Sequence, residues 1–246
     1  MRCCSLGHYV PSFVFQAAAA GYDCIWLDLE HRALTLRETQ AILSACHLHD
    51  IDCMVRVPTR EKVQLYRYLE DGASGLMIPH VSTADEARDL VNSVKFPPLG
   101  ERGLDNAGLD ADYYAHHIDE YAKWADRETF LTVQIETPEA VENVEEIAAV
   151  PGVDLMFVGP GDLGYRMRHD DKGDSDGSRL EEAFERIAAA AASNKIAWAC
   201  PTSGIDNIRH RVSQGCRFIA NCGDFMMIRD GLNEGAEELG NAISGS

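Results

Sequence analysis

Two carboxylates near the middle of the chain have the spacing of a cation site. Glu136 ends the apolar run FLTVQIE, and Asp162 follows the apolar run VDLMFV in the turn Gly-Pro-Gly-Asp. If both runs are neighbouring parallel strands, each delivers its acid at the same end of the sheet. A hard divalent cation prefers a few such oxygen ligands, with water and substrate completing its shell. The alternative is a surface glutamate and an ordinary turn aspartate.

Other polar side chains stand where further apolar runs end. Asp28, Glu30 and His31 follow the run beginning at residue 22, Arg56 ends the next run, and Gln134 precedes Glu136. Each has an ordinary explanation as a loop histidine, a solvated arginine or a buried amide. If they all lie at one end of one domain, the functional interpretation of each is strengthened, and together they could provide acid–base catalysis and bind an anion.

These residues need a scaffold that brings successive strand ends together. We count eight strand candidates, each followed by a helical segment, and this alternation indicates a parallel sheet with right-handed crossovers. Eight units in about 250 residues is typical of a closed (β/α)₈ TIM barrel, whose active site lies at the carboxyl ends of the strands. The whole chain, 1–246, is expected to form this single domain. An open doubly wound sheet is the alternative, but no GxGxxG or GxxxxGK[ST] motif follows any strand.

Local signals place several helices. Thr35 and Thr83 are expected N-caps, and Thr137 followed by Pro138 predicts a helix over 138–150. A further helix is expected over 110–126. Residues 159–162 are expected to form a turn, and the polar stretch 166–178 a surface excursion.

Composition excludes some partners. The 246 residues include 22 Lys and Arg against 40 Asp and Glu, a net charge of −18, which disfavours nucleic acid and anionic membranes. No stretch resembles a signal peptide or a spanning helix. Most of the eight cysteines lie in apolar runs and form no CxxC pair, so buried free thiols in a reducing cytoplasm are expected.

The motifs together resemble one known family. WLDLEH, VRVP, EDGASGLMIPHVSTADEA, FPPLGERG, VQIETPEAVENVEEIAAVPGVD and FVGPGDLG are similar, in this order, to those of the HpcH/HpaI family of class II 2-oxo acid aldolases. The similarity extends from about residue 21 to the last helical segment. It implies a TIM barrel that assembles through its last helix into a homo-oligomer, a hexamer described as a trimer of dimers.

The resemblance also implies roles. Glu136 and Asp162 would bind Mg²⁺, Mn²⁺ or Co²⁺, His31 would be the base and Arg56 would stabilise the enolate. Gln134 and the backbone at Gly161 would contact the 2-oxo acid. The acid that supports His31 would be Glu70 by its spacing from VRVP, or else Asp28. Where relatives commonly have glycine after the EH pair, this chain has Arg32, which would change the entrance used by the aldehyde.

The implied chemistry is consistent with the residue types. A 2-oxo acid can chelate a cation, which polarises the keto group, while a histidine moves the proton near neutral pH. An arginine stabilises developing enolate charge. Metal-free aldolases need a Schiff-base lysine, and none of the five lysines ends a strand in an apolar setting. Substrates would be a small 2-oxo acid and an aldehyde. An acyl-CoA lyase and a non-catalytic 2-oxo acid-binding barrel are the alternatives.

Overall fold

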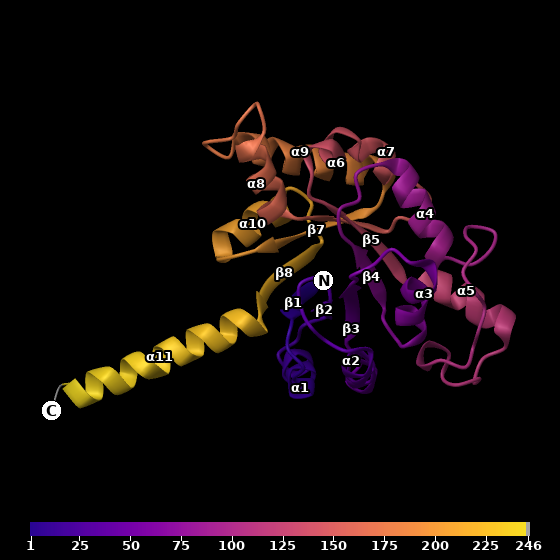
Figure 1. Ribbon diagram of the computed structural model, residues 1–246, viewed down its shortest axis with the longest axis horizontal. Helices are drawn as coiled ribbons and strands as arrows, with labels where there is room; N and C mark the ends of the chain where they lie inside the picture. Colours follow the sequence, from indigo (N-terminus) through magenta and orange to yellow (C-terminus); the bar gives the residue numbers. More distant parts are fainter. Residues whose placement is uncertain (245–246) are drawn as a thin grey trace.

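Eight parallel strands close into one barrel in the computed structural model, which describes residues 1–244 (Figure 1). Each strand pairs with its neighbours in sequence, and β1 also pairs with β8, so the open sheet is excluded and the (β/α)₈ prediction is confirmed. The strands are β1 Arg2–Leu6, β2 Cys24–Asp28, β3 Asp52–Arg56, β4 Gly75–Ile78, β5 Phe130–Ile135, β6 Leu155–Val158, β7 Ala197–Thr202 and β8 Phe218–Gly223.

Helices surround the barrel, and only the last one projects away from it as a long arm (Figure 1). They are α1 Pro11–Ala19, α2 Leu36–Leu48, α3 Lys62–Glu70, α4 Ala84–Val94, the 3₁₀ helix η1 Leu109–Ala111, α5 Ile118–Glu128, α6 Pro138–Glu142, α7 Val144–Ala148, α8 Pro160–His169, α9 Ser178–Asn194, α10 Ile205–Ser213 and α11 Asp224–Ser244. Thr35, Thr83 and Thr137 cap α2, α4 and α6 as predicted, the first two in complete capping boxes.

Three local predictions were wrong. The helix expected over 110–126 begins only at Ile118, because residues 112–114 have positive φ and form a turn after η1. The helix expected over 138–150 is broken at Asn143, whose side chain donates to the Ser82 carbonyl. The expected turn at 159–162 already contains the start of α8, which continues through His169. The surface excursion expected over 166–178 is therefore confined to the turn-rich residues between α8 and α9. Proline at the first position of a helix favours that early start.

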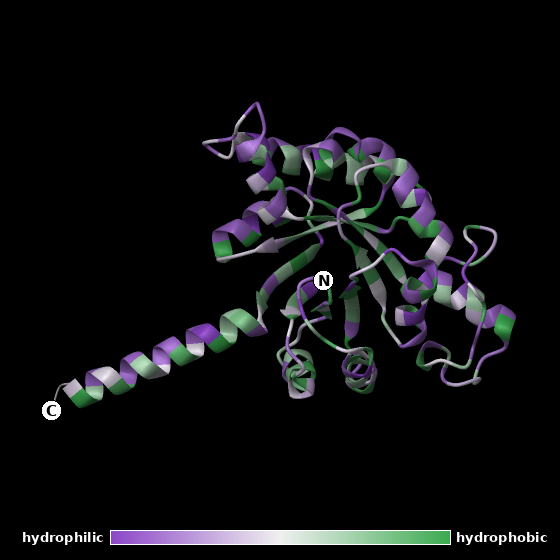
Figure 2. Ribbon diagram, in the orientation of Figure 1, coloured by the Kyte–Doolittle hydropathy of each residue, from purple (hydrophilic) through white to green (hydrophobic). Residues whose placement is uncertain are grey.

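Strand alternation sorts the side chains into two cores. Alternate residues such as Leu27, Val55 and Val133 face the helices in one large cluster. The intervening residues, including Met54, Met77 and Phe157, fill the barrel interior. Figure 2 shows that the strands are largely apolar and that the surrounding helices carry polar residues on their outer faces. Along β2, β3 and β5 every second side chain points into the barrel, and the last inward-pointing ones are Asp28, Arg56 and Gln134, which were expected at the site.

The remaining sequence predictions concern thiols and membranes. The eight cysteines are free, and all except the half-buried Cys222 are buried. No helix within residues 1–244 combines the length and the apolar character needed to cross a bilayer.

Candidate active site

Asp28 and Arg56 are cross-strand neighbours at the ends of β2 and β3. Arg56 donates from Nε to Asp28 Oδ1 at 3.0 Å and from Nη2 to Asp28 Oδ2 at 2.8 Å, and its guanidinium carbon lies 4.8 Å from the Trp26 ring centroid. Both charged side chains are buried. A two-point pair of this kind fixes the plane of the arginine, so Arg56 is held rigidly at the top of the barrel.

The same aspartate shapes the loop that carries Glu30 and His31. Asp28 Oδ1 accepts from the backbone amides of Glu30 and His31, at 3.1 and 3.3 Å. Burial tends to raise the pKa of Asp28, but the hydrogen bonds and charge of Arg56 outweigh it and hold that pKa below its usual value. Asp28 therefore acts as an anion that anchors both Arg56 and this loop.

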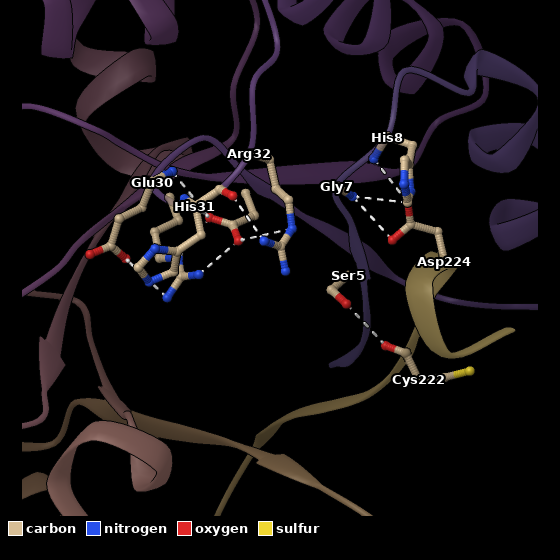
Figure 3. Close-up of polar contacts among 10 residues, drawn as sticks. Ser5, Gly7, His8, Glu30, His31, Arg32, Cys222 and Asp224 are labelled. Carbon is tan, nitrogen blue, oxygen red and sulfur yellow. Dashed lines mark hydrogen bonds and ion pairs between the residues drawn. The ribbon is translucent and has the colours of Figure 1, made fainter. Parts of the chain in front are cut away.

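The exposed His31 ring lies beside Glu30. Its Nε2 is 3.6 Å from Glu30 Oε2, the same oxygen that lies 3.1 Å from Arg56 Nη1. Figure 3 shows the Glu30 and His31 side chains next to each other. The structure thus brings His31, Arg56 and Asp28 together, with Glu30 as the carboxylate nearest to the histidine ring.

Glu136 lies just beyond the end of β5 and is almost fully buried. Its Oε2 accepts from Gln134 Nε2 at 2.5 Å, and its Oε1 accepts from the backbone amide of His80 at 2.7 Å and lies 2.9 Å from His80 Nδ1. A Cβ on Gly159 would lie 2.8 Å from both Gln134 Nε2 and Glu136 Oε2. It would also lie 2.9 Å from Glu136 Cβ, which cannot swing away, so glycine directly after β6 leaves room for this carboxylate.

Asp162 stands in the first turn of α8, directly after β6, and is exposed with Gly161. Within residues 1–244 its carboxylate has no hydrogen-bond or ion-pair partner. The first amides of a helix have no partner within that helix, so the amides at Gly161 and Asp162 can receive an anion. A Cβ on Gly161 would meet no atom within 4 Å, so space is open beside it.

The charges around Glu136 suit a cation. Burial raises the pKa of Glu136, and the negative charges of Glu30 and Asp162 raise it further against the opposing influence of His80. A divalent cation between Glu136 and Asp162 would relieve this repulsion, and oxygen ligands are those that Mg²⁺ or Mn²⁺ prefers. No group of three or more acidic, histidine or cysteine side chains within residues 1–244 is arranged to hold a metal, so water and substrate would supply the other ligands.

Comparison with known proteins identifies the family of this barrel. The family model HpcH/HpaI aldolase/citrate lyase matches residues 6–230. The chain belongs to this family. It is 34% identical over 212 residues to the hydroxypyruvate/pyruvate aldolase of Delftia acidovorans, covering 86% of this chain and 78% of that protein. It is 33% identical over 230 residues to the 4-hydroxy-2-oxovalerate aldolase of Novosphingobium aromaticivorans, covering 92% and 84%.

A solved structure agrees with the sequence relatives. The HpcH/HpaI aldolase from Desulfitobacterium hafniense superposes with a TM-score of 0.90 at 29% identity, covering 97% of this chain and 92% of that one. Membership in the HpcH/HpaI family and relatives named as aldolases over most of their length make this chain a carbon–carbon lyase.

One residue expected at the site lies elsewhere. Glu70 is the last residue of α3, and because α3 returns from the carboxyl end of β3 to the amino end of β4, Glu70 lies at the opposite end of the barrel from His31. It lines a cavity of about 570 Å³ with Arg67, Asp71 and Asp105. The structure therefore does not bring Glu70 to His31, and Asp28 touches the backbone of His31 rather than its ring.

The structure places the buried lysine away from the site. Lys95 is the buried lysine of residues 1–244, and its Nζ donates to the carbonyls of Asp126 and Thr129. These residues precede β5 and lie at the end of the barrel opposite Glu136. No buried lysine in the described chain stands at the site.

His80 was missed by sequence reasoning. It follows β4 with a positive φ of 59°, and its Nε2 lies 3.4 Å from Glu30 Oε1 while its Nδ1 contacts Glu136. It thus connects the two halves of the site. The sequence offered one indication, namely that His80 directly follows the apolar run SGLMIP, as Arg56 ends the apolar run before it.

Proposed function

We propose that this chain is a divalent-metal-dependent aldolase that reversibly cleaves a 4-hydroxy-2-oxo acid into pyruvate, or hydroxypyruvate, and an aldehyde. The main support is the convergence of two acids, Glu136 and Asp162, with His31 and Arg56 at the carboxyl end of one barrel. The printed activities of the relatives point to the same 2-oxo acid chemistry.

Glu136 and Asp162 would hold Mg²⁺, Mn²⁺ or Co²⁺. The cation, when bound, supplies Lewis-acid polarisation of the keto group. The free amides at the start of α8, at Gly161 and Asp162, would receive the carboxylate of the 2-oxo acid. Gln134 donates from Nε2 to Glu136, and its buried Oε1 has no hydrogen-bond partner, so this oxygen would accept from a donor on the substrate.

His31 would take the proton from the C4 hydroxyl. The C3–C4 bond then breaks, its electron pair forms the enolate, and the aldehyde leaves. His31, now protonated, returns this proton to C3 and gives the 2-oxo acid product; in the reverse direction it removes a proton from C3 before the bond forms. Arg56, held by Asp28 and Glu30, would stabilise the enolate oxygen without changing its own protonation. His31 and Glu30 are close enough for the carboxylate to orient the ring after a small adjustment from 3.6 Å.

The assembly we propose is a homo-oligomer, a hexamer built as a trimer of dimers, with α11 at its contacts. Only Asp224 of its 21 residues is buried, and Phe225, Met226, Leu232 and Leu239 expose between 42% and 68% of their surface. Figure 2 shows apolar and polar residues alternating along this arm. An amphipathic helix without a covering layer in its own chain suits a second copy.

Removal and return of metal tests the function. Treatment with EDTA should abolish aldol turnover of pyruvate with a panel of aldehydes, and Mg²⁺, Mn²⁺ or Co²⁺ should restore it. Full turnover in a sample shown to be metal-free would contradict the proposal.

A further inference from the structure

Arg32 lies at the mouth of the barrel, immediately after His31. Its Nη1 donates to the His31 carbonyl at 2.8 Å, and its guanidinium carbon lies 4.2 Å from the Phe225 ring centroid. Figure 3 shows the guanidinium between the Glu30–His31 group and the group formed by Gly7, His8 and Asp224. The side chain retains 38% exposure, so a ligand at the mouth can reach it.

The close approach of Arg32 depends on Gly7. A Cβ at Gly7 would lie 3.0 Å from Arg32 Cγ and Nε and 2.5 Å from the Phe225 ring. Gly7 is itself fixed, because its amide donates to both carboxylate oxygens of the buried Asp224 at 3.1 Å. Arg32 therefore packs against the backbone that follows β1, which restricts its side-chain conformations. Binding a ligand would then cost little additional side-chain entropy.

The charge of Arg32 is only weakly compensated. Its nearest acid is Asp28, whose Oδ2 is 4.0 Å from Arg32 Nε. That carboxylate already accepts two hydrogen bonds from Arg56. Arg32 Nη2 has no partner within residues 1–244. The mouth thus presents a positioned cation with an unused donor, although the protein as a whole carries a net charge of −18.

We propose that Arg32 binds a negatively charged group, a carboxylate or a phosphate, on the aldehyde half of the substrate. This inference rests on the proposed function. With the 2-oxo acid held between Glu136, Asp162 and Arg56, and the C4 hydroxyl near His31, the chain beyond C4 extends past His31. Arg32 adjoins His31, because its Nη1 donates to the His31 carbonyl, and this position makes it a specificity-determining residue for the aldehyde.

The overall negative charge does not oppose this assignment at close range. Charges more than about 8 to 10 Å away are largely screened at physiological salt. Of the nearer acids, Asp28 is paired with Arg56 and Asp224 with His8 and the Gly7 amide, so Arg32 decides the local preference. A charge-assisted hydrogen bond of this kind should favour an anionic aldehyde over a neutral one by about 10- to 100-fold in kcat/KM.

Matched aldehydes test the inference. With pyruvate and Mn²⁺, kcat/KM for aldol formation is measured for succinic semialdehyde against butanal, and for glyceraldehyde 3-phosphate against glyceraldehyde. The wild-type enzyme should favour the charged member of at least one pair by about 10- to 100-fold, and the pair that shows it identifies the group. Arg32→Gln should bring that ratio close to one.

The ratio separates recognition from folding. Both members of a pair use the same metal, pyruvate and base, so a general loss of activity lowers both rates and leaves their ratio intact. Arg88→Gln, which removes an exposed arginine of α4 paired with Asp85, should keep the wild-type ratio. If Arg32→Gln fails to fold, Arg32→Lys answers the same question, because it keeps the charge without the planar fork and should lower the ratio several-fold.

Two results would overturn the inference. One is a wild-type ratio near one for both pairs while aldol turnover proceeds, which would leave the aldolase function standing. The other is a ratio that survives in Arg32→Gln. Absence of any aldol turnover and of proton exchange at the pyruvate methyl group would instead refute the proposed function, and this inference with it.

Discussion

Replacing Asp28 with asparagine should destabilise the fold measurably, because it breaks the charge pairing of a buried arginine. Arg56 makes two hydrogen bonds to Asp28, at 3.0 and 2.8 Å, and its other close acid is Glu30 at 3.1 Å. Removing one member of a buried ion pair costs about 3–5 kcal/mol. Since asparagine keeps one acceptor and Glu30 stays in place, we expect about 2–3 kcal/mol for Asp28→Asn.

The assay is thermal or urea unfolding of metal-free protein at one fixed protein concentration, because oligomers make stability concentration-dependent. For a chain of this size each kcal/mol shifts Tm by roughly 2–4 °C, so Tm should fall by about 4–12 °C. Asp85→Asn, which alters an exposed acid paired with Arg88, serves as the control and should change Tm little.

The pH dependence follows from the lowered pKa of Asp28. A carboxyl group whose folded pKa lies below its unfolded value stabilises the fold above the unfolded pKa of about 3.9, and this contribution is lost as pH falls through the folded pKa. The difference between wild type and Asp28→Asn should therefore be constant near neutral pH and shrink in acid. A Tm change at neutral pH no larger than that of Asp85→Asn would refute the pairing argument.

Two further predictions concern parts of the chain outside the catalytic group. Burial raises the pKa of Glu70 to about 6; nearby aspartates add to this effect, and the charge of Arg102 opposes it. The protonated form therefore stabilises the fold at low pH, and this contribution is lost as pH rises through about 6. In unfolding experiments, Glu70→Gln should become more stable relative to wild type as pH rises from 4.5 to 7.5, and its aldol turnover should be unchanged. A loss of turnover of 100-fold or more would show that Glu70 does act at the site. Leu232→Glu with Leu239→Glu on α11 should yield a smaller species in light scattering coupled to size exclusion, with Val63→Glu on α3 as an exposed control, and an unchanged mass would remove α11 from the interface.

The sequence predicted the barrel because its signals are local and repeated. Each apolar run with its following helix is one βα unit, and eight of them suffice to predict closure. The directions of Asp28, Arg56, Gln134 and Glu136 follow from strand alternation, since each continues the inward phase of its strand. The positions of these four side chains could therefore be predicted from the sequence.

The misplaced residues depended on geometry that spacing does not encode. Glu70 was assigned by counting from VRVP, but the return direction of α3 carries it to the other end of the barrel. The connection of His80 to Glu30 and Glu136 depends on a positive φ in a loop, which no residue pattern announced. Similarly, the turn with positive φ at residues 112–114 interrupts an apolar pattern that alone favours a helix.

The most direct test of the proposed mechanism is proton exchange at the pyruvate methyl group, followed by NMR in D₂O with Mn²⁺ or Mg²⁺ and no aldehyde. Wild-type protein should catalyse exchange only with metal present. Glu136→Gln should lose both exchange and metal affinity, whereas His31→Ala should keep its metal affinity and exchange about 10²–10⁴-fold more slowly, the usual contribution of a positioned base. Exchange at the wild-type rate in His31→Ala would show that another group is the base and would contradict the mechanism at its central step.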